Sequence, residues 1–175
     1  MVHRLNEILI VVDEDDNVIG KSPYSEVRKK GLITRSSNIF IFSSEGKIFI
    51  HKRNRQLSLY PGMWDVKVGG SVSYGESYED AALRELKEET GIIATEEQLE
   101  YLFSTKFRSN EHNVSRKIFR IIYDGKMTLQ KSEIEEGRFV SIKEAEKLVK
   151  DGLVSPSAKE VFERYLAYLN KQKFS

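Results

Sequence analysis

The chain of 175 residues contains no cysteine and only three prolines. The absence of cysteine excludes disulfide bonds, thiolate zinc sites, iron–sulfur clusters and cysteine nucleophiles. No apolar run approaches the roughly 18 residues that a membrane-spanning helix requires. The first residues carry charges and lack the apolar core of a secretion signal. We therefore expect a cytoplasmic protein without a membrane partner.

An excess of charge of one sign is also missing. The 28 lysines and arginines are balanced by 27 acidic residues, which leaves a formal net charge of +1. A protein held mainly by nucleic-acid phosphates would be more basic, so no nucleic-acid polymer is expected as a partner. The length and the 39% hydrophobic content are typical of one globular domain that covers residues 1–175.

Hydrophobic periodicity and turn residues predict short strands interspersed with helices. Strands are expected at residues 7–12, 18–20, 37–42, 47–51, 65–68, 99–107, 115–123 and 137–141. Helices are expected at residues 24–30, 77–90, 143–150 and 156–169, the last with Ser155 as its cap. This order predicts an α/β fold with a mixed sheet and helices packed on its faces.

The densest chemistry lies in residues 70–92, which read GSVSYGESYEDAALRELKEETGI. This segment has six acidic and two basic residues, so its net charge of −4 stands out in a nearly neutral chain. Ser77 and Asp80 have the spacing of a capping box. Gly91 is a natural left-handed stop. A well-delimited helix is therefore expected between them.

Glu85, Glu88 and Glu89 have the spacing i, i+3, i+4 and share an arc of roughly 100° on this helix. Like charges this close repel each other, and a hard divalent cation removes the penalty because it prefers carboxylate oxygens. Arg84 lies four residues before Glu88 and can pair with it. The alternative is an ordinary solvated face of a glutamate-rich helix.

The full spacing decides between these alternatives. The segment follows G-x5-E-x7-R-E-U-x-E-E-x-G-U, where U is aliphatic, at Gly70, Glu76, Arg84, Glu85, Leu86, Glu88, Glu89, Gly91 and Ile92. A chance match has a probability on the order of 10⁻⁹ to 10⁻⁸ per starting point. The pattern resembles the Nudix box. The resemblance implies an α/β/α sandwich and metal-dependent hydrolysis of a diphosphate, such as a nucleoside diphosphate linked to another group.

The resemblance also implies roles, position by position. Glu85 and Glu89 resemble the main ligands of Mg²⁺ or Mn²⁺, and Glu88 resembles a further ligand or the base acting on water. The carbonyl of Gly70 is a candidate ligand, Glu76 a supporting carboxylate, and Arg84 resembles the family's orienting arginine. A metal ion can neutralise the diphosphate and lower the pKa of bound water, which suits this reaction.

Beyond the box, most of the chain resembles type I isopentenyl diphosphate isomerases and the bacterial hydrolases close to them. The resemblance includes VDEDDNVIGKSPYSEVRKKG, residues 35–53 and the Tyr60-Pro61-Gly62-Met63-Trp64 segment. Those isomerases use a cysteine just after this segment, and Gly69 occupies its place here. Ser71, Lys30 and Ser37 fall where the isomerases have metal-binding histidines. We therefore expect a hydrolase, with an isomerase that uses a different acid or a non-catalytic nucleotide-binding module as alternatives.

Several residues outside the box are further candidates. Arg53 and Lys67 are predicted to contact substrate phosphate, with a surface-charge role as the alternative for them and for their neighbours His51, Lys52 and Arg55. Trp64, the single tryptophan, suits a core position better than a stacking platform. Candidate extra carboxylates in later loops are Glu133, Glu135 and Glu136, with Glu111 and His112 as further candidate contacts. The substrate is expected to be a small diphosphate, and the protein a monomer or a homodimer through its last helix.

Overall fold

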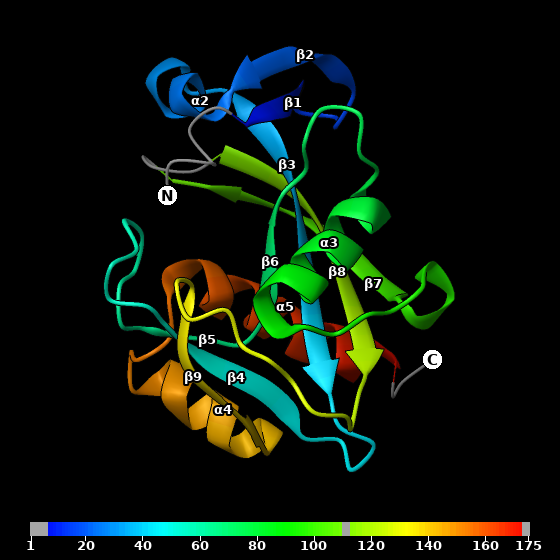
Figure 1. Cartoon of the computed structure of the whole chain (residues 1–175), viewed down its shortest axis with the longest axis vertical. Helices are drawn as coiled ribbons and strands as arrows, with labels where there is room; N and C mark the ends of the chain where they lie inside the picture. The colour runs from blue at the N-terminus through cyan, green and yellow to red at the C-terminus, as the bar shows by residue number, and fades with distance from the viewer. Residues whose placement is uncertain (1–6, 110–112, 173–175) are drawn as a thin grey trace. The chain divides into compact units, whose positions relative to one another are not determined.

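The computed structural model describes residues 7–109 and 113–172. Figure 1 shows its strands and helices in chain order. The strands are β1 (Ile8–Val12), β2 (Val18–Pro23), β3 (Ile33–Phe42), β4 (Ile48–Arg53), β5 (Trp64–Asp65), β6 (Val68–Ser71), β7 (Glu100–Arg108), β8 (Asn113–Ile122) and β9 (Ile134–Val140). The helices are α2 (Tyr24–Lys30), α3 (Tyr78–Thr90), α4 (Ile142–Lys150) and α5 (Pro156–Gln172), with a 3₁₀ turn at Glu96–Gln98.

The contacts within the chain define two compact units. The first, unit 1, combines the described parts of Met1–Ile39, Gly69–Glu88 and Ile92–Ile121. The second, unit 2, combines Phe40–Val68, Glu89–Gly91 and the described part of Ile122–Ser175. Four elements, β3, β6, α3 and β8, contribute residues to both units. Each unit is described separately below.

Unit 1 is built around β3. Strand β1 pairs antiparallel with β2 and with β3, while β6 and β8 also pair with β3. Strands β7 and β8 form an antiparallel pair that can be followed in Figure 1, with Tyr101 opposite Phe119. Four of the five residues of β1 are buried, which explains its continuous apolar sequence. Fully buried side chains of this unit include Leu9, Ile39, Ile92 and Ile118.

Unit 2 is built around β4, which pairs antiparallel with β5 and β9. Residues 48–51 of β4 are all buried, so both of its faces are covered. Helix α5 buries Val161, Phe162 and Tyr165, and the Tyr165 ring lies 4.9 Å from that of Phe40, measured between centroids. Helix α4 begins at the N-cap Ser141, whose hydroxyl accepts the backbone N–H of Glu144. The cap satisfies one of the donors that every helix start leaves open.

The structure confirms the four predicted helices and corrects some strand predictions. The strand expected at residues 65–68 is wrong: β5 ends at Asp65, and β6 begins at Val68. The break follows from the Asp65 carboxylate, which accepts the backbone N–H of Lys67 and turns the chain there. Strand β3 begins at Ile33, earlier than expected, because tertiary pairing recruits polar residues that show no apolar pattern.

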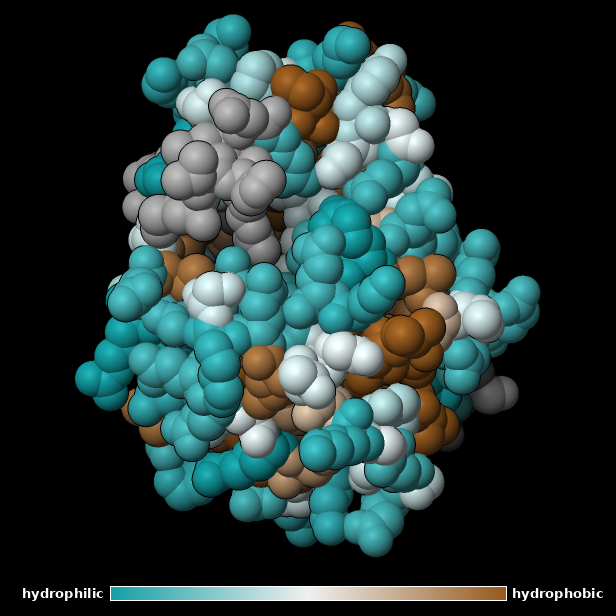
Figure 2. All heavy atoms as spheres, in the orientation of Figure 1, coloured by the Kyte–Doolittle hydropathy of each residue, from teal (hydrophilic) through white to brown (hydrophobic). Residues whose placement is uncertain are grey.

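The face of the molecule drawn in Figure 2 is mostly hydrophilic. Figure 2 shows one face on which hydrophilic side chains predominate and apolar ones form small groups. The exposed large hydrophobic residues are Ile8, Val18, Ile19, Tyr74, Ile93, Tyr101, Ile122 and Leu153. None of the helices between residues 7 and 172 has the length and apolar character needed to cross a bilayer.

Candidate active site

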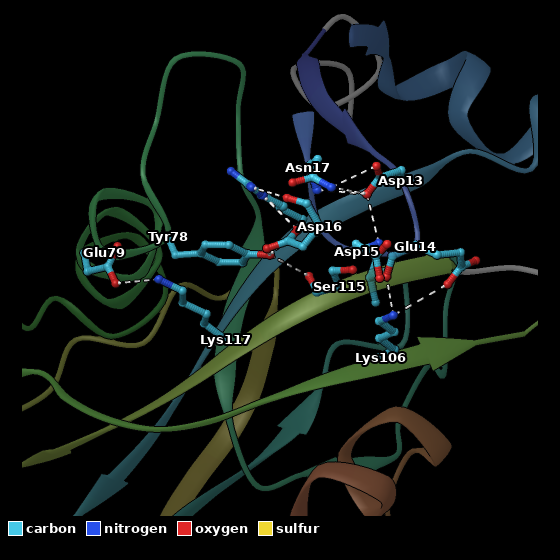
Figure 3. Close-up of polar contacts among 12 residues, drawn as sticks. Asp13, Glu14, Asp15, Asp16, Asn17, Tyr78, Glu79, Lys106, Ser115 and Lys117 are labelled. Carbon is cyan, nitrogen blue, oxygen red and sulfur yellow. Dashed lines mark hydrogen bonds and ion pairs between the residues drawn. The ribbon is translucent and has the colours of Figure 1, made fainter. Parts of the chain in front are cut away.

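Helix α3 begins at the predicted capping box. The Ser77 hydroxyl accepts the N–H of Asp80 at 2.9 Å, and the Asp80 carboxylate accepts the N–H of Ser77 at 3.0 Å. The next residue, Tyr78, donates its hydroxyl to the carboxylate of Asp16, at 3.0 and 3.1 Å. Arg35 donates to the same carboxylate at 3.0 Å. Asp16 lies in the turn between β1 and β2, and Figure 3 shows Tyr78 reaching from α3 to that turn. The contact between Tyr78 and Asp16 anchors the start of the helix within unit 1.

The glutamates of α3 differ sharply in exposure. Glu85 is 4% exposed and Glu89 is 7% exposed, whereas the Glu88 side chain is about half exposed. A solvated helix face therefore describes Glu88 but not the other two. Burying a carboxylate is unfavourable unless it is paired or bound, so Glu85 and Glu89 need partners. On the same helix, Leu86 and Thr90 are fully buried, while Leu83 is only partly buried.

Arg84 is the centre of the polar contacts in unit 1. Its Nε and Nη2 donate to the two oxygens of Glu76 at 2.8 and 3.1 Å, and Nη1 donates to Glu85 Oε1 at 2.7 Å. Nη2 also donates to the carbonyl of Ser71 at 3.0 Å. The predicted pair with Glu88 is present but longer, at 3.6 Å. Arg84 therefore orients Glu76 and Glu85 more closely than it orients Glu88.

The ionisation of these groups follows from the same contacts. Burial by itself would raise the pKa of Glu76, but hydrogen bonds from Arg84 and from the Ser73 N–H, with the Arg84 charge, bring that pKa below its ordinary value. Burial would lower the pKa of Arg84, but Glu76 and Glu85 raise it above its ordinary value. Both groups are therefore charged at neutral pH.

Two adjacent glycines shape the strand that precedes the helix. Gly70 packs directly on the Glu85 carboxylate, since a Cβ on residue 70 would lie 2.3 Å from Oε1. Gly69 has a φ of +139°, and a Cβ there would lie 2.1 Å from the carbonyl oxygen of Ser37. The position that resembles the isomerase cysteine is therefore one that only glycine fits in this backbone.

The donors around Glu85 fit a hard divalent cation. In unit 1 they are oxygens, namely the carboxylates of Glu85 and Glu88, which both approach Arg84, and the backbone of Gly70, and Mg²⁺ or Mn²⁺ prefers such ligands. The missing side chain of Gly70 lets the Glu85 carboxylate lie against the backbone of that strand. Among the described residues, no three acidic or histidine side chains already converge as a metal site. Arg84 holds Glu85 and approaches Glu88, and it would share these carboxylates with a bound ion.

Unit 2 contains a buried charged cluster that the sequence prediction only partly identified. Arg53 Nη1 and Lys67 Nζ lie 3.8 and 3.9 Å from Oδ2 of Asp65. Asp65 and the neighbouring His51 are buried. The alternative role of a surface charge therefore does not apply to His51. The sequence prediction named Arg53 and Lys67 but missed Asp65. It named Ser155 only as a helix cap, whereas the Ser155 hydroxyl also donates to Asp65 Oδ2 at 3.3 Å. An acidic residue flanked by cations at strand ends is the signal that could have identified it.

The candidate late carboxylates are placed around the end of β4. The Glu135 carboxylate accepts the backbone N–H of Arg55 at 3.2 Å, and Glu136 lies 3.8 Å from Lys52 Nζ. The carbonyl of Glu133 accepts the N–H of Asn54. Glu135 also lies 3.5 Å from Arg55 Nε, so Glu135 and Glu136 both pair with cations of their own unit. Glu111 and His112 lie outside the described residues.

Trp64 occupies a position between the two predicted environments. Its ring is partly buried, and the Arg138 guanidinium lies 5.1 Å from the ring centroid. Its backbone N–H donates to Leu153, and its carbonyl accepts the N–H of Ser155. Trp64 therefore links β5 to the segment before α5 through its backbone. Its cation–π contact with Arg138 stabilises by about 0.5–1 kcal/mol, the value typical of an exposed site.

The fold and the loop–helix around Glu85 define a protein of the Nudix type, and comparison with known proteins agrees. The family model described as the NUDIX domain matches residues 32–165. An uncharacterized Nudix hydrolase, PA4841 of Pseudomonas aeruginosa, is 36% identical over 145 residues, which cover 80% of this chain and 83% of that protein. The chain therefore belongs to the Nudix family.

Two further comparisons concern the fold and the resemblance to the isomerases. The crystal structure of DR0079 from Deinococcus radiodurans has a TM-score of 0.77 at 25% identity, covering 90% of this chain and 98% of that one. This likeness confirms the predicted α/β fold. An isopentenyl-diphosphate Delta-isomerase of Serratia proteamaculans is 38% identical over 95 residues, which cover 54% of this chain and 53% of that enzyme. The chain thus spans about half of that isomerase.

Proposed function

We propose that this protein is a diphosphohydrolase that depends on Mg²⁺ or Mn²⁺ and cleaves a small diphosphate by attack of water on phosphorus. A nucleoside diphosphate derivative is the substrate class that the Nudix box favours. The proposal treats residues 1–175 as one catalytic domain with its box at residues 70–92. The observation that carries it is the Glu85 carboxylate, which is buried, bonded to Arg84 and packed against Gly70.

In this proposal, the ion is held by Glu85 and Glu89, with Glu88 and the Gly70 carbonyl as further ligands. The bound ion supplies charge neutralisation and lowers the pKa of water. Glu88, the most exposed of the helix carboxylates, is the candidate to accept the proton of water, since it can move without disturbing buried neighbours. Arg84 orients Glu85 through Nη1, and Glu76 fixes the guanidinium from the other side. Arg53 and Lys67 are the proposed contacts to phosphate.

The test is hydrolysis by a variant in which Glu89 becomes glutamine. We expect Glu89→Gln to lower kcat by several orders of magnitude, since the amide keeps the shape and removes the negative charge that binds metal. Far-ultraviolet circular dichroism and thermal unfolding check the fold. Glu163→Gln, on the exposed face of α5, is the matched control and should keep full activity. Undiminished turnover by Glu89→Gln would refute the assignment as a metal-dependent diphosphohydrolase.

The substrate is to be found with a metal-supplemented screen. The panel contains nucleoside diphosphates and triphosphates, diphosphate sugars, dinucleoside polyphosphates and prenyl diphosphates, read by phosphate release. Binding across this panel without any hydrolysis would favour a non-catalytic nucleotide-binding module instead. The buried Glu85 and Glu89 argue against that alternative, because a binding module has no need for crowded carboxylates.

Isomerisation of isopentenyl diphosphate is the second candidate, favoured by the Serratia relative. Two observations oppose it. The chain has no cysteine to protonate an alkene, and residue 69 cannot accept one without movement of the Ser37 carbonyl. Incubation with isopentenyl diphosphate in D₂O decides the question, since deuterium in dimethylallyl diphosphate would establish isomerase activity.

A further inference from the structure

The buried carboxylate of Asp65 is held from two sides in unit 2. Asp65 is 2% exposed and lies opposite His51 in the antiparallel pairing of β4 and β5. Its Oδ1 accepts the backbone N–H of Lys67 at 3.1 Å. Its Oδ2 accepts the hydroxyl of Ser155 at 3.3 Å. Neither oxygen can move without breaking a contact to a buried or backbone group, so the carboxylate is a fixed point.

Two cationic side chains, those of Arg53 and Lys67, lie close to the Asp65 carboxylate. Arg53 Nη1 and Lys67 Nζ lie 3.8 and 3.9 Å from the same Oδ2. Burial by itself would raise the pKa of Asp65, but the charges of Lys67 and Arg53 and the hydrogen bond from the Lys67 N–H bring that pKa below its ordinary value, so the carboxylate is charged. Burial lowers the pKa of His51 to about 4, so His51 is neutral at pH 7. The cluster of Arg53, Lys67, Asp65 and His51 therefore carries a net charge of +1.

Arg53 uses only one of its guanidinium nitrogens, Nε, as a hydrogen-bond donor within the described part of unit 2. Its Nε donates to the carbonyl of Leu59 at 3.1 Å, which fixes the plane of the guanidinium. Nη1 is 3.8 Å from Asp65, beyond hydrogen-bond distance. Among residues 7–109 and 113–172, the two terminal nitrogens of Arg53 therefore attract Asp65 by charge alone. Their N–H groups remain available to another acceptor. The side chain is about one-quarter exposed, so an anion from solvent can reach it.

We propose that Asp65 is a positioning residue, whose buried carboxylate holds Arg53 and Lys67 together as a binding site for a phosphate group. The two cations would otherwise repel each other and separate into solvent. The ligand class is a phosphate or diphosphate, because a surplus positive charge and a forked donor match its oxygens. That this anion is part of the substrate rests on the proposed function, whereas the anion site itself does not.

Positioning and simple charge make opposite predictions for Asp65→Asn. If the carboxylate only offset positive charge, its removal would raise the net charge of the cluster to +2 and bind an anion more tightly. If the carboxylate positions the cations, its removal lets them separate, and an anion binds more weakly. The sign of the change in affinity therefore distinguishes the two roles.

The experiment is isothermal titration calorimetry of inorganic pyrophosphate into the full-length protein in EDTA, so that no metal contributes. We expect the wild type to bind, Arg53→Ala to lose binding and Asp65→Asn to bind about tenfold more weakly. Asp151→Asn, an exposed aspartate paired with Lys147, is the matched control and should bind like the wild type. Absence of binding by the wild type, full binding by Arg53→Ala, or equal or tighter binding by Asp65→Asn would overturn the proposal.

A second variant covers the case in which Asp65→Asn does not fold. Ser155→Ala removes the hydroxyl that holds Oδ2 and keeps the carboxylate charge. It also removes the cap of α5, so Ser141→Ala, which removes the cap of α4 only, is its control. We expect Ser155→Ala to bind pyrophosphate about threefold more weakly than Ser141→Ala. Equal affinity of the two serine variants would overturn the positioning role.

Hydrolysis measured in parallel separates this inference from the proposed function. If the wild type binds pyrophosphate through Arg53 and Asp65 but hydrolyses nothing in the metal-supplemented screen, the proposed function fails and the anion site stands. If the wild type hydrolyses a diphosphate and Asp65→Asn binds pyrophosphate as tightly as the wild type, the positioning role fails and the function stands.

Discussion

Substitution of Gly69 by alanine tests the closest backbone approach in unit 1. Gly69 has a φ of +139°, and a Cβ there would lie 2.1 Å from the Ser37 carbonyl oxygen and 3.0 Å from the Asn38 Cα. Both atoms belong to the backbone of β3, which cannot rotate away as a flexible side chain can. Non-bonded heavy atoms prefer separations of about 3.5 Å or more. The two strands would therefore have to move apart by more than about 1 Å.

The cost has two parts. An alanine in this backbone conformation costs about 1–3 kcal/mol, and overpacking of a filled interior costs about another 1–3 kcal/mol. We expect Gly69→Ala to lose about 4 kcal/mol of unfolding free energy, a large share of the 5–15 kcal/mol that is typical of a domain. Gly75→Ala is the matched control, because Gly75 has a φ of +96° with nothing within 4 Å of its added Cβ. The control carries the conformational cost alone.

Urea unfolding followed by circular dichroism measures both variants. The difference between them should be about 2 kcal/mol or more, seen as a lower midpoint at an unchanged slope. If Gly69→Ala and Gly75→Ala lose the same stability within 1 kcal/mol, the backbone contact has been misjudged. The expected result would also mean that a cysteine at residue 69 is as costly as alanine, so isomerase chemistry cannot be introduced there by one substitution.

Three further predictions concern the other parts of the molecule. Arg84→Lys should lower kcat about 100-fold, because an ammonium cannot hold Glu76 and Glu85 at once; equal kcat in steady-state assays would contradict this. Gly70→Ala should remain folded in thermal melts yet lose turnover, since its Cβ displaces the flexible Glu85 carboxylate, and an active variant would refute the close approach. The pKa of His51 is lowered from 6.5 to about 4, so its contribution to stability is present above pH 6.5 and is lost toward pH 4. The free energy of unfolding should fall by roughly 3 kcal/mol over that window, and His51→Asn should flatten this slope in urea titrations.

The helices were well predictable from the sequence because their signals are local. Ser77, Asp80 and Gly91 lie next to the residues that they cap or stop, and the structure has the capping bonds and a left-handed Gly91. Strand boundaries were less predictable. Strand β3 begins at Ile33 because of partners that are distant in sequence, and the break after Asp65 depends on a side-chain bond to Lys67.

The candidate site divides in the same way. The spacing of Glu85, Glu88 and Glu89 is a property of one helix, so the sequence could predict their common arc. Their unequal burial could not be predicted, because it depends on what packs against each side chain. Sequence spacing favoured Glu88 as the partner of Arg84, whereas the structure shows that Arg84 bonds more closely to Glu76, which lies on the preceding loop.

The sequence by itself determined the family and the carboxylate helix, because the Nudix box is a local pattern of nine positions. It also determined that no cysteine takes part in the chemistry, since composition does not depend on folding. Only the tertiary structure decided that Gly69 has no space for a side chain and that Asp65 lies between Arg53 and Lys67. Both facts arise from contacts between different strands, and distances across a sheet cannot be obtained from spacing along the chain.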